Sequence, residues 1–443
     1  MASAAEQLAA NLNFGAFAKA EALKKRIWFT LGALLIYRLG TYIPLPGINP
    51  DALAQAFNAN SAGLLGMFNM FAGGAVGRMA IFALGIMPYI SASIIIQLLT
   101  SIVPTLEQLK KEGEQGRKVI NQYTRYGTVI LAVLQSYGIA VGLEGGTNIV
   151  VDPGMFFRLT TVITLTGGTM FLMWLGEQIT SRGIGNGISL IIFSGIVANL
   201  PSAFVGTLEL GREGALSTFL ILAVGVMAIA VIAFIVFVER AQRRLLIQYP
   251  KRQVGNRMFQ GDSSHLPLKL NTAGVIPPIF ASSLLLLPVT LASFSAGQGP
   301  EWLTTVTALL GHGQPLYMLF YAGLIGFFAF FYTAVVFNPT DTADNLKKHG
   351  GFIPGIRPGA KTAEYIDYVL SRITVVGALY LVAVCLLPEF LISYAGVPFY
   401  FGGTSLLIVV SVTMDTVAQV QGHLLAHQYE GLVKKSKLRG RSR

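Results

Sequence analysis

The sequence predicts an all-α protein that crosses a membrane many times, and three observations support this fold class. Only 12% of the 443 residues are charged and 53% are hydrophobic, whereas soluble domains carry about 25% charged residues. The apolar residues form long unbroken runs, unlike the alternating strands of a membrane barrel. Lys and Arg residues gather between alternate runs. This composition excludes a soluble enzyme and a disordered chain.

Ten apolar runs come close to the length of about 20 residues that a helix needs to cross a bilayer. We expect these spans at Ile27–Ile43, Ala80–Thr100, Tyr123–Leu143, Leu159–Gly176, Gly187–Phe204, Phe219–Val238, Gly274–Phe294, Tyr317–Phe337, Ile373–Ile392 and Gly403–Leu425.

The distribution of basic residues predicts the orientation of these spans. All but four of the 32 Lys and Arg residues lie on the same side of the membrane as the two termini, the exceptions being Arg38, Arg78, Arg158 and Arg212. Basic residues are retained on the cytoplasmic side, so we expect both termini in the cytoplasm. The net charge of +11 would also attract anionic phospholipid. The two longest basic loops could bind an acidic protein partner or nucleic-acid phosphates as well.

The spans and loops divide the chain into segments. We expect cytoplasmic segments at 1–26, 239–273 and 426–443, an N-terminal half at 27–238 that includes the sixth span, and a C-terminal half at 274–425 with a cytoplasmic loop at 338–372. The loop 239–273 thus has six predicted spans before it and four after it. We nevertheless expect two halves of five spans each around a central site, and an odd number of spans gives the halves opposite orientations.

The segment 61–77, between the first two spans, is rich in glycine and interrupts this pattern. Its apolar stretch Leu64–Phe71 is too short to cross the membrane. Irregular backbone at membrane depth requires surrounding protein or a water-filled cavity. We therefore expect a re-entrant segment that lines a cavity, and a loop at the outer interface is the alternative.

Ionisable side chains are nearly absent from the interior of the predicted spans. Apart from the span ends, only Asp415 lies inside them. Ion-coupled transporters require such groups near the midplane, so the sequence favours a passive pathway lined by apolar side chains. A secondary transporter of a small solute is the alternative. The chain has no nucleotide-binding or catalytic motif, and we expect no enzyme activity, cofactor or metal site.

Two further patterns have more than one reading. Ile86 and Ile90, like Ile188 and Ile192, are four residues apart and share a helix face, which faces either a pore or lipid. Arg357 stands between two prolines that restrict its backbone, so it is either a recognition residue or an ordinary turn residue.

Several long strings resemble the SecY family of protein-conducting channels over nearly the whole chain. They include FALGIMPYISASIIIQLLT at Phe82–Thr100, MFLMWLGEQITSRGIGNGIS at Met170–Ser189, GFIPGIRPG at Gly351–Gly359 and PFYFGGTSLLIVV at Pro398–Val410. The resemblance implies a passive pore in the bacterial inner membrane. Such a pore passes unfolded secretory polypeptides across the membrane and releases membrane helices sideways into it.

The resemblance also implies roles for individual residues. A ring of aliphatic side chains that closes the pore would consist of Ile86, Ile90, Ile188, Ile192, Ile279 and Ile408. A plug that closes the outer funnel would contain Leu64, Leu65, Met67, Phe68, Asn69 and Phe71. The lateral gate, a seam that opens towards lipid, would contain Ser91, Gln135 and Asn271.

The partners that the resemblance implies are the small subunits SecE and SecG, the motor ATPase SecA, the ribosome through its RNA and proteins, signal sequences, nascent polypeptides and anionic phospholipid. SecA and the ribosome would dock on Arg240, Arg243, Arg244, Lys251, Arg252 and Arg357.

Overall fold

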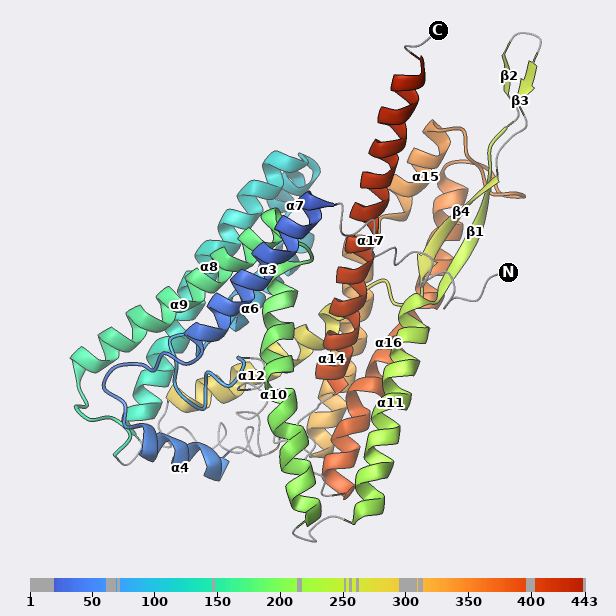
Figure 1. The fold of residues 1–443 in the computed structure, drawn as a ribbon. Coiled ribbons are helices and arrows are strands. Elements are labelled where there is room, and N and C mark those ends of the chain that lie inside the picture. The colour runs from blue at the N-terminus through green and yellow to red at the C-terminus, as the bar shows by residue number, and fades with distance from the viewer. Residues whose placement is uncertain are drawn as a thin grey trace.

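The computed structural model is almost entirely helical (Figure 1). It describes residues 20–60, 69, 72–145, 148–212, 217–250, 252–254, 257–259, 263–294, 309, 314–395 and 403–440. The first half contains α3 (Glu21–Gly40), α4 (Pro50–Asn60), α6 (Met87–Ile102), α7 (Pro104–Lys111), α8 (Glu114–Glu144), α9 (Met155–Arg182) and α10 (Gly187–Arg212). The remainder contains α11 (Thr218–Arg240), α12 (Ile276–Phe294), α14 (Pro315–Val336), α15 (Pro339–Lys348), α16 (Ala360–Ala395) and α17 (Gly403–Gly440), and the strands β1 (Gln242–Gln248), β2 (Arg252–Val254), β3 (Arg257–Phe259) and β4 (Ser263–Lys269).

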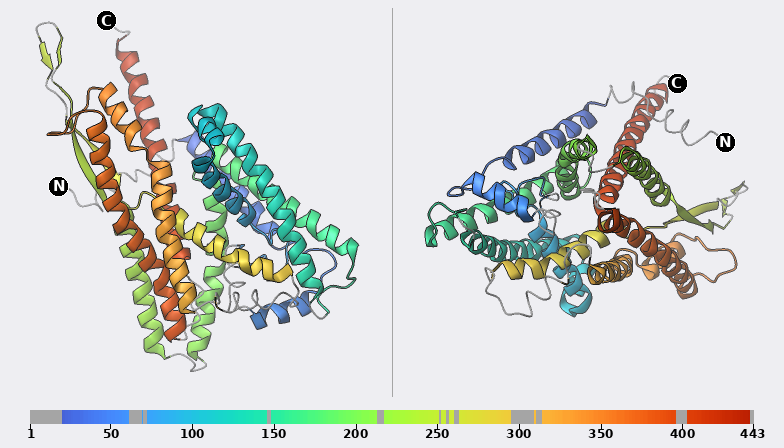
Figure 2. Two further views of the ribbon diagram at one scale, coloured as in Figure 1. Left: turned by 180° about the vertical axis from the view of Figure 1, so that it is seen from behind. Right: turned by 90° about the horizontal axis from the view of Figure 1, so that it is seen from below.

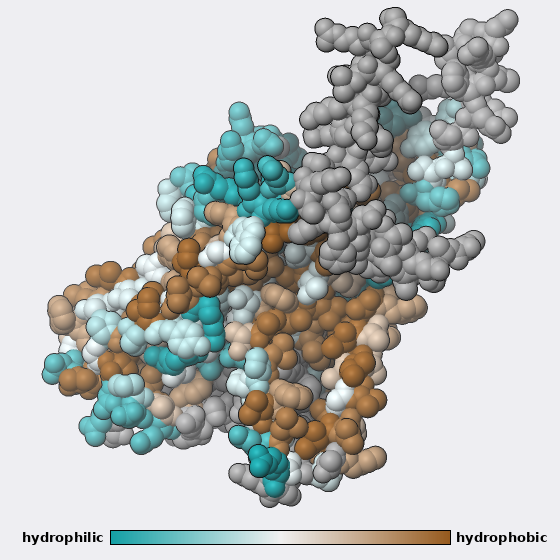
Figure 3. Space-filling view, viewed as in Figure 1, coloured by the Kyte–Doolittle hydropathy of each residue, from teal (hydrophilic) through white to brown (hydrophobic). Residues whose placement is uncertain are grey.

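The predicted spans correspond to long helices. Among the described residues, seven helices are long and apolar enough to cross a membrane, and α6 and α7 together make an eighth with a bend of 97°. α3 and α12 lie at the two other predicted spans. The surface that Figure 3 presents has a broad hydrophobic region over these helices and hydrophilic residues near its ends. The all-α membrane fold is therefore confirmed, and β1–β4 add two small sheets that the sequence analysis did not predict.

The predicted second span, Ala80–Thr100, begins too early. Residues 72–86 form consecutive turns, and the helix α6 starts only at Met87. The backbone has positive φ angles at Met79 and Gly85, which are incompatible with a right-handed helix. Pro88 then occupies the first turn of α6, where its missing N–H is tolerated. The irregular backbone thus extends well beyond the expected segment 61–77.

The spanning helices form two groups, which Figure 2 shows from behind and from below. The groups are α3, α6, α8, α9 and α10, and α11, α12, α14, α16 and α17. α11 packs on α17, and its Phe234 ring meets Tyr380 of α16 edge-on at 5.7 Å between centroids. By its packing, the sixth span lies mainly with the second group, although it also contacts α10.

The two basic loops, between α11 and α12 and between α14 and α16, form one packed body. β1 and β4 pair in antiparallel register, with Leu245 opposite Leu266. The Gln248 and Phe352 backbones exchange N–H···O hydrogen bonds of 2.9 and 3.0 Å, which ties the ribbon to the loop before α16. Leu245 and Ile353 pack in one cluster with Ile366 of α16. Backbone pairing and apolar packing therefore hold both basic loops against α16.

The largest hydrophobic core lies between the two groups of helices. It contains buried residues from both, including Leu172 of α9, Ile192 of α10, Ile325 of α14, Leu381 of α16 and Ile408 of α17. The groups are thus held together where their apolar faces meet.

At Gly168, the backbone of α9 lies so close to the backbone of the turn segment before α6 that only glycine fits. A Cβ atom at this position would overlap the carbonyl of Ile81 in the turn segment, whereas one at the adjacent Gly167 would meet nothing within 4 Å. We expect Gly168→Val to lower the free energy of unfolding by about 1–3 kcal/mol, the usual cost of overpacking. Thermal unfolding in detergent measures this, with Gly167→Val as the matched control. Equal melting temperatures for the two variants would contradict it.

Candidate pore constriction and lateral seam

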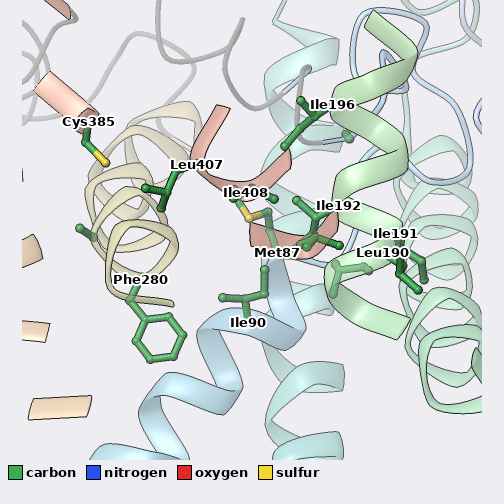
Figure 4. Packing of buried hydrophobic residues seen from close by; sticks show 14 of the residues in the cluster. Met87, Ile90, Leu190, Ile191, Ile192, Ile196, Phe280, Cys385, Leu407 and Ile408 are labelled. Atoms are coloured by element: carbon green, nitrogen blue, oxygen red, sulfur yellow. The ribbon is translucent and has the colours of Figure 1, made fainter. Parts of the chain in front are cut away.

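Six isoleucines from four helices gather between the two halves. Ile86 immediately precedes α6 and Ile90 lies in its first turn, Ile188 and Ile192 lie at the start of α10, Ile279 on α12 and Ile408 on α17. All six belong to, or pack against, the main hydrophobic core. Figure 4 shows Ile90, Ile192 and Ile408 approaching one another around Met87 from three different helices. The helix faces that the sequence left open between pore and lipid therefore point inward.

A small cavity lies among these isoleucines. Its lining includes Ile86, Ile90, Ile192 and Ile279, and its volume is about 10 Å³. A cavity of that size has room for about one water molecule. Ile188 and Ile408 do not line it but pack in the same core. The passage between the halves is therefore closed by hydrocarbon.

The chemistry of this constriction is that of a seal. Aliphatic side chains offer no hydrogen bond to water and no ligand to an ion, so a narrow passage lined by them excludes both by dewetting. A seal made only of side chains from separate helices yields when the helices separate. The arrangement therefore suits a passage that is closed to ions at rest and opens for a larger object.

The turn segment that precedes α6 reaches this constriction. Ala72 and Gly85 line the same cavity as the isoleucines. Of the predicted plug residues, Leu64, Leu65, Met67, Phe68 and Phe71 lie outside the described residues. Asn69 is described: its side-chain oxygen accepts from the Gly77 N–H at 2.8 Å and its carbonyl from the Gly74 N–H at 2.8 Å. Asn69 thus holds together the turn that carries Ala72 against the constriction.

One side of the pore is a seam at which α12 packs against α6 and α8 (Figure 2). The Ser283 hydroxyl on α12 donates to the Met87 sulfur on α6 at 3.8 Å. Towards the cytoplasmic loops, the Lys110 ammonium on α7 donates to the Val335 carbonyl on α14 at 3.4 Å. The Ser283 hydroxyl also has a nearer acceptor in the Ile279 carbonyl of its own helix at 2.8 Å, and the Lys110 contact is long, so polar interactions add little to the apolar packing of the seam.

Of the three predicted seam residues, two lie on helices that border the seam and one lies within the second group of helices. Ser91 is buried on α6 and Gln135 is half-buried on α8, both on helices that border the seam. Asn271 is buried just before α12, where its amide donates to Glu239 at 2.7 Å and to the Gly274 carbonyl at 3.1 Å. Glu239 ends α11, so this pair of hydrogen bonds lies within the second group of helices. It fixes the start of α12 rather than crossing the seam.

The predicted docking residues lie on or beside the two packed basic loops. Arg240 at the end of α11, and Arg243 and Arg244 on β1, are exposed. Arg357 is exposed in a turn between Gly355 and Gly359, which both have positive φ angles, and its carbonyl accepts from the Thr362 hydroxyl at 2.9 Å. Lys251 and the side chain of Arg252 lie outside the described residues. The Arg357 guanidinium is thus presented to solvent from a fixed backbone.

Sequence reasoning missed two residues that contact the opposite half at the seam, Ser283 and Lys110. The pair Ser282-Ser283 inside an apolar run was the available signal for the first, because an intramembrane hydroxyl is usually hydrogen-bonded to a neighbouring helix or to its own backbone. Lys110 has no such signal, because it is one of many basic residues in a cytoplasmic loop. Only the fold brings it to α14.

The fold and the site define a class of protein, an all-helical membrane channel with an apolar constriction between two halves. Comparisons with known proteins agree. A model of the SecY family matches residues 80–417. The protein translocase subunit SecY of Escherichia coli strain K12 is 58% identical over 425 residues, which are 95% of this chain and 96% of that protein. The chain belongs to the SecY family.

Solved structures share the fold. One described as a protein-conducting channel matches with a TM-score of 0.63 at 18% identity, over 90% of this chain and 92% of that one. Sec61 from a canine ribosome–channel complex of the endoplasmic reticulum matches with a TM-score of 0.59 at 18% identity, with the same coverage.

The constriction makes a prediction about ion leakage. We expect replacement of Ile86, Ile192 and Ile408 by Thr to raise the resting ion conductance of the purified protein in planar bilayers, because hydroxyl groups let water enter. Replacement of the same three residues by Val keeps the shape of Thr but remains apolar, so we expect a conductance near that of the wild type. Equal conductance in the Thr and Val variants would show that polarity at the constriction does not matter.

Proposed function

We propose that this chain is the channel-forming subunit of a bacterial Sec translocon, through which unfolded secretory polypeptides cross the inner membrane. The observation that carries the proposal is the closed apolar constriction, formed by isoleucines of α6, α10, α12 and α17. An extended polypeptide fits between helices that part by a few ångströms, and the aliphatic side chains then close around it. The relationship to a protein translocase subunit at 58% identity supports the same activity.

In this proposal the channel is passive and is not an enzyme. A polypeptide moves because SecA hydrolyses ATP or because a ribosome extends the chain on the cytoplasmic side. The protein supplies the path, the six-isoleucine seal and a plug in the segment 61–77. In the closed state the plug fills the outer funnel, with Leu64, Leu65, Met67, Phe68, Asn69 and Phe71 as its residues.

The seam provides the sideways exit. A signal sequence is itself an apolar helix, so it can replace the packing of α12 on α6 and α8 and shift the equilibrium towards an open seam. Ser91, Gln135 and Asn271 are the polar residues assigned to this gate. A membrane-protein helix would leave by the same route.

The cytoplasmic loops provide the docking surface. Exposed Arg240, Arg243, Arg244 and Arg357 suit acidic residues of SecA and the phosphates of ribosomal RNA. Lys251 and Arg252 complete the proposed set. The relative Sec61 was solved in a ribosome–channel complex, which supports the ribosome as a partner.

The same proposal gives the orientation of the chain in the membrane and its membrane partners. The basic loops and both termini would face the cytoplasm, where Lys and Arg also attract anionic phospholipid. SecE and SecG would be the small membrane subunits that accompany the chain.

The alternative of a secondary transporter has less support. Apart from the span ends, Asp415 remains the one ionisable residue inside the predicted spans. The described constriction offers isoleucine side chains where a transporter would bind its ion.

Reconstitution tests the proposal. We expect proteoliposomes that contain this chain with SecE and SecG to import a secretory precursor when SecA and ATP are present. Protease protection of the precursor is the measurement, and liposomes without SecA or with a non-hydrolysable ATP analogue are the controls. Import that continues without a motor would contradict a passive channel, and solute uptake without precursor import would favour the transporter.

Docking makes a separate prediction. We expect Arg357→Ala to weaken SecA binding to the reconstituted channel about tenfold, because a fixed guanidinium forms paired hydrogen bonds with carboxylates. The measurement is the SecA concentration that half-saturates import. Lys361→Ala is the matched control, because Lys361 is a nearby exposed cation already paired with Glu364 at 2.8 Å. If both substitutions weakened SecA binding equally, the prediction would be contradicted, because Arg357 would then contribute only its positive charge and no specific contact.

A further inference from the structure

The glycine-rich turn 183–187, between α9 and α10, contacts the second group of helices on the side away from the seam. The Gly185 N–H donates to the side-chain oxygen of Gln419 on α17 at 2.8 Å, the distance of a well-formed N–H···O hydrogen bond. The contact of Lys110 across the seam is longer, at 3.4 Å. Gln419 therefore gives the two groups of helices a firm polar contact.

Two further hydrogen bonds fix the same turn to its own group of helices. The Ile184 N–H donates to the Thr30 hydroxyl on α3 at 3.1 Å, and the Gly187 N–H donates to the Thr180 hydroxyl on α9 at 2.9 Å. The N–H groups at the start of a helix have no acceptor within that helix, so Thr180 supplies one for the first residue of α10. The turn is therefore tied to α3 and α9.

Side chains of α17 also fill the space beside the turn. Gly185 has a positive φ angle of 87°, and a Cβ atom there would lie 2.8 Å from a methyl carbon of Leu190 and 3.3 Å from the Thr416 hydroxyl oxygen on α17. Ile184 is buried in a cluster that includes Leu424 of α17. The turn is thus seated against α17 in a conformation that favours glycine.

This turn leads directly into the constriction. Ile188 and Ile192 lie at the start of α10, and Figure 4 shows Ile192 approaching Ile408 of α17. Gln419 and Ile408 are separated by about three helical turns, so they lie on the same face of α17. The hydrogen bond at Gln419 and the apolar contact at Ile408 therefore join the same two helices along one face.

We infer that Gln419 is a positioning residue that fixes how far α10 extends along α17, and so keeps Ile188 and Ile192 level with Ile408. Apolar attraction is non-directional, so it does not set the axial position of one helix on another. A hydrogen bond depends on distance and angle, so it does. The inference rests on the proposed function, because it takes these isoleucines to be the seal of a channel. Without Gln419, α10 can shift along α17 and the seal fits less closely.

Distances between spin labels test the position of α10 directly. The labels replace the exposed residues Phe204 of α10 and Val417 of α17, in the complex with SecE and SecG and with Cys385→Ala to remove the native thiol. We expect Gln419→Leu, which removes the acceptor but keeps the size, to broaden the distance distribution. Gln421→Leu is the matched control on another face of α17, and we expect it to leave the distribution unchanged. An unchanged distribution in Gln419→Leu would overturn the inference.

Osmotic swelling of proteoliposomes in a neutral sugar alcohol tests the effect on the seal. We expect Gln419→Leu to raise the resting permeability about fivefold, the effect of losing one neutral hydrogen bond. Gln419→Glu still offers an oxygen to the Gly185 N–H, and a neutral solute does not respond to its charge, so we expect a value near that of the wild type. A permeability of Gln419→Leu equal to the wild type, or of Gln419→Glu equal to Gln419→Leu, would overturn the inference.

Import and a further variant separate positioning from general damage. We expect Gln419→Leu to import a SecA-driven precursor at a rate within about twofold of the wild type, because the path itself is intact. Gln419→Ala carries the same tests if Gln419→Leu does not fold. A wild-type complex that imports nothing would overturn the proposed function, whereas the label distances would still decide whether Gln419 positions α10.

Discussion

A passage wide enough for a polypeptide must still hold back ions when no polypeptide is present, and apolar contact at the constriction meets this demand. Ile86 just before α6, Ile192 of α10 and Ile408 of α17 pack in one core, and the first two line a cavity of about 10 Å³. Eight of the nine residues that line this cavity are apolar or glycine, the exception being Ser282, and apolar side chains bind neither water nor ions. The same core also holds the two groups of helices together.

The strengths of the polar contacts indicate where the halves separate. Across the seam, Ser283 meets Met87 at 3.8 Å and Lys110 meets Val335 at 3.4 Å. Within one half, Asn271 donates to Glu239 at 2.7 Å. Away from the seam, the Gly185 N–H donates to the Gln419 side chain on α17 at 2.8 Å, which joins the two groups of helices. The seam between α12 and the helices α6 and α8 therefore has weaker polar contacts than the side of the interface where α17 lies.

Apolar run lengths and the distribution of basic residues were sufficient to predict the helical fold, and the resemblance identified the six isoleucines. The start of α6 was not predictable, because Ala80–Ile86 is as apolar as the helix that follows and only the backbone angles at Met79 and Gly85 interrupt it. The sequence also did not indicate that α11 packs with the second group of helices, because the long basic loop after α11 resembles a boundary between halves. The contacts of α11 with α17 are visible only in the structure.

The docking loops and the pore share a short covalent path. β4 ends at Lys269, the Leu270 N–H donates to the Ala241 carbonyl at 3.0 Å, and Asn271 then fixes the start of α12. The same helix carries Ile279 of the constriction and Ser283 of the seam. Pairing between Gln248 and Phe352 makes both loops one body. The fold thus connects the two basic loops directly to the first turn of the helix that carries Ile279 and Ser283.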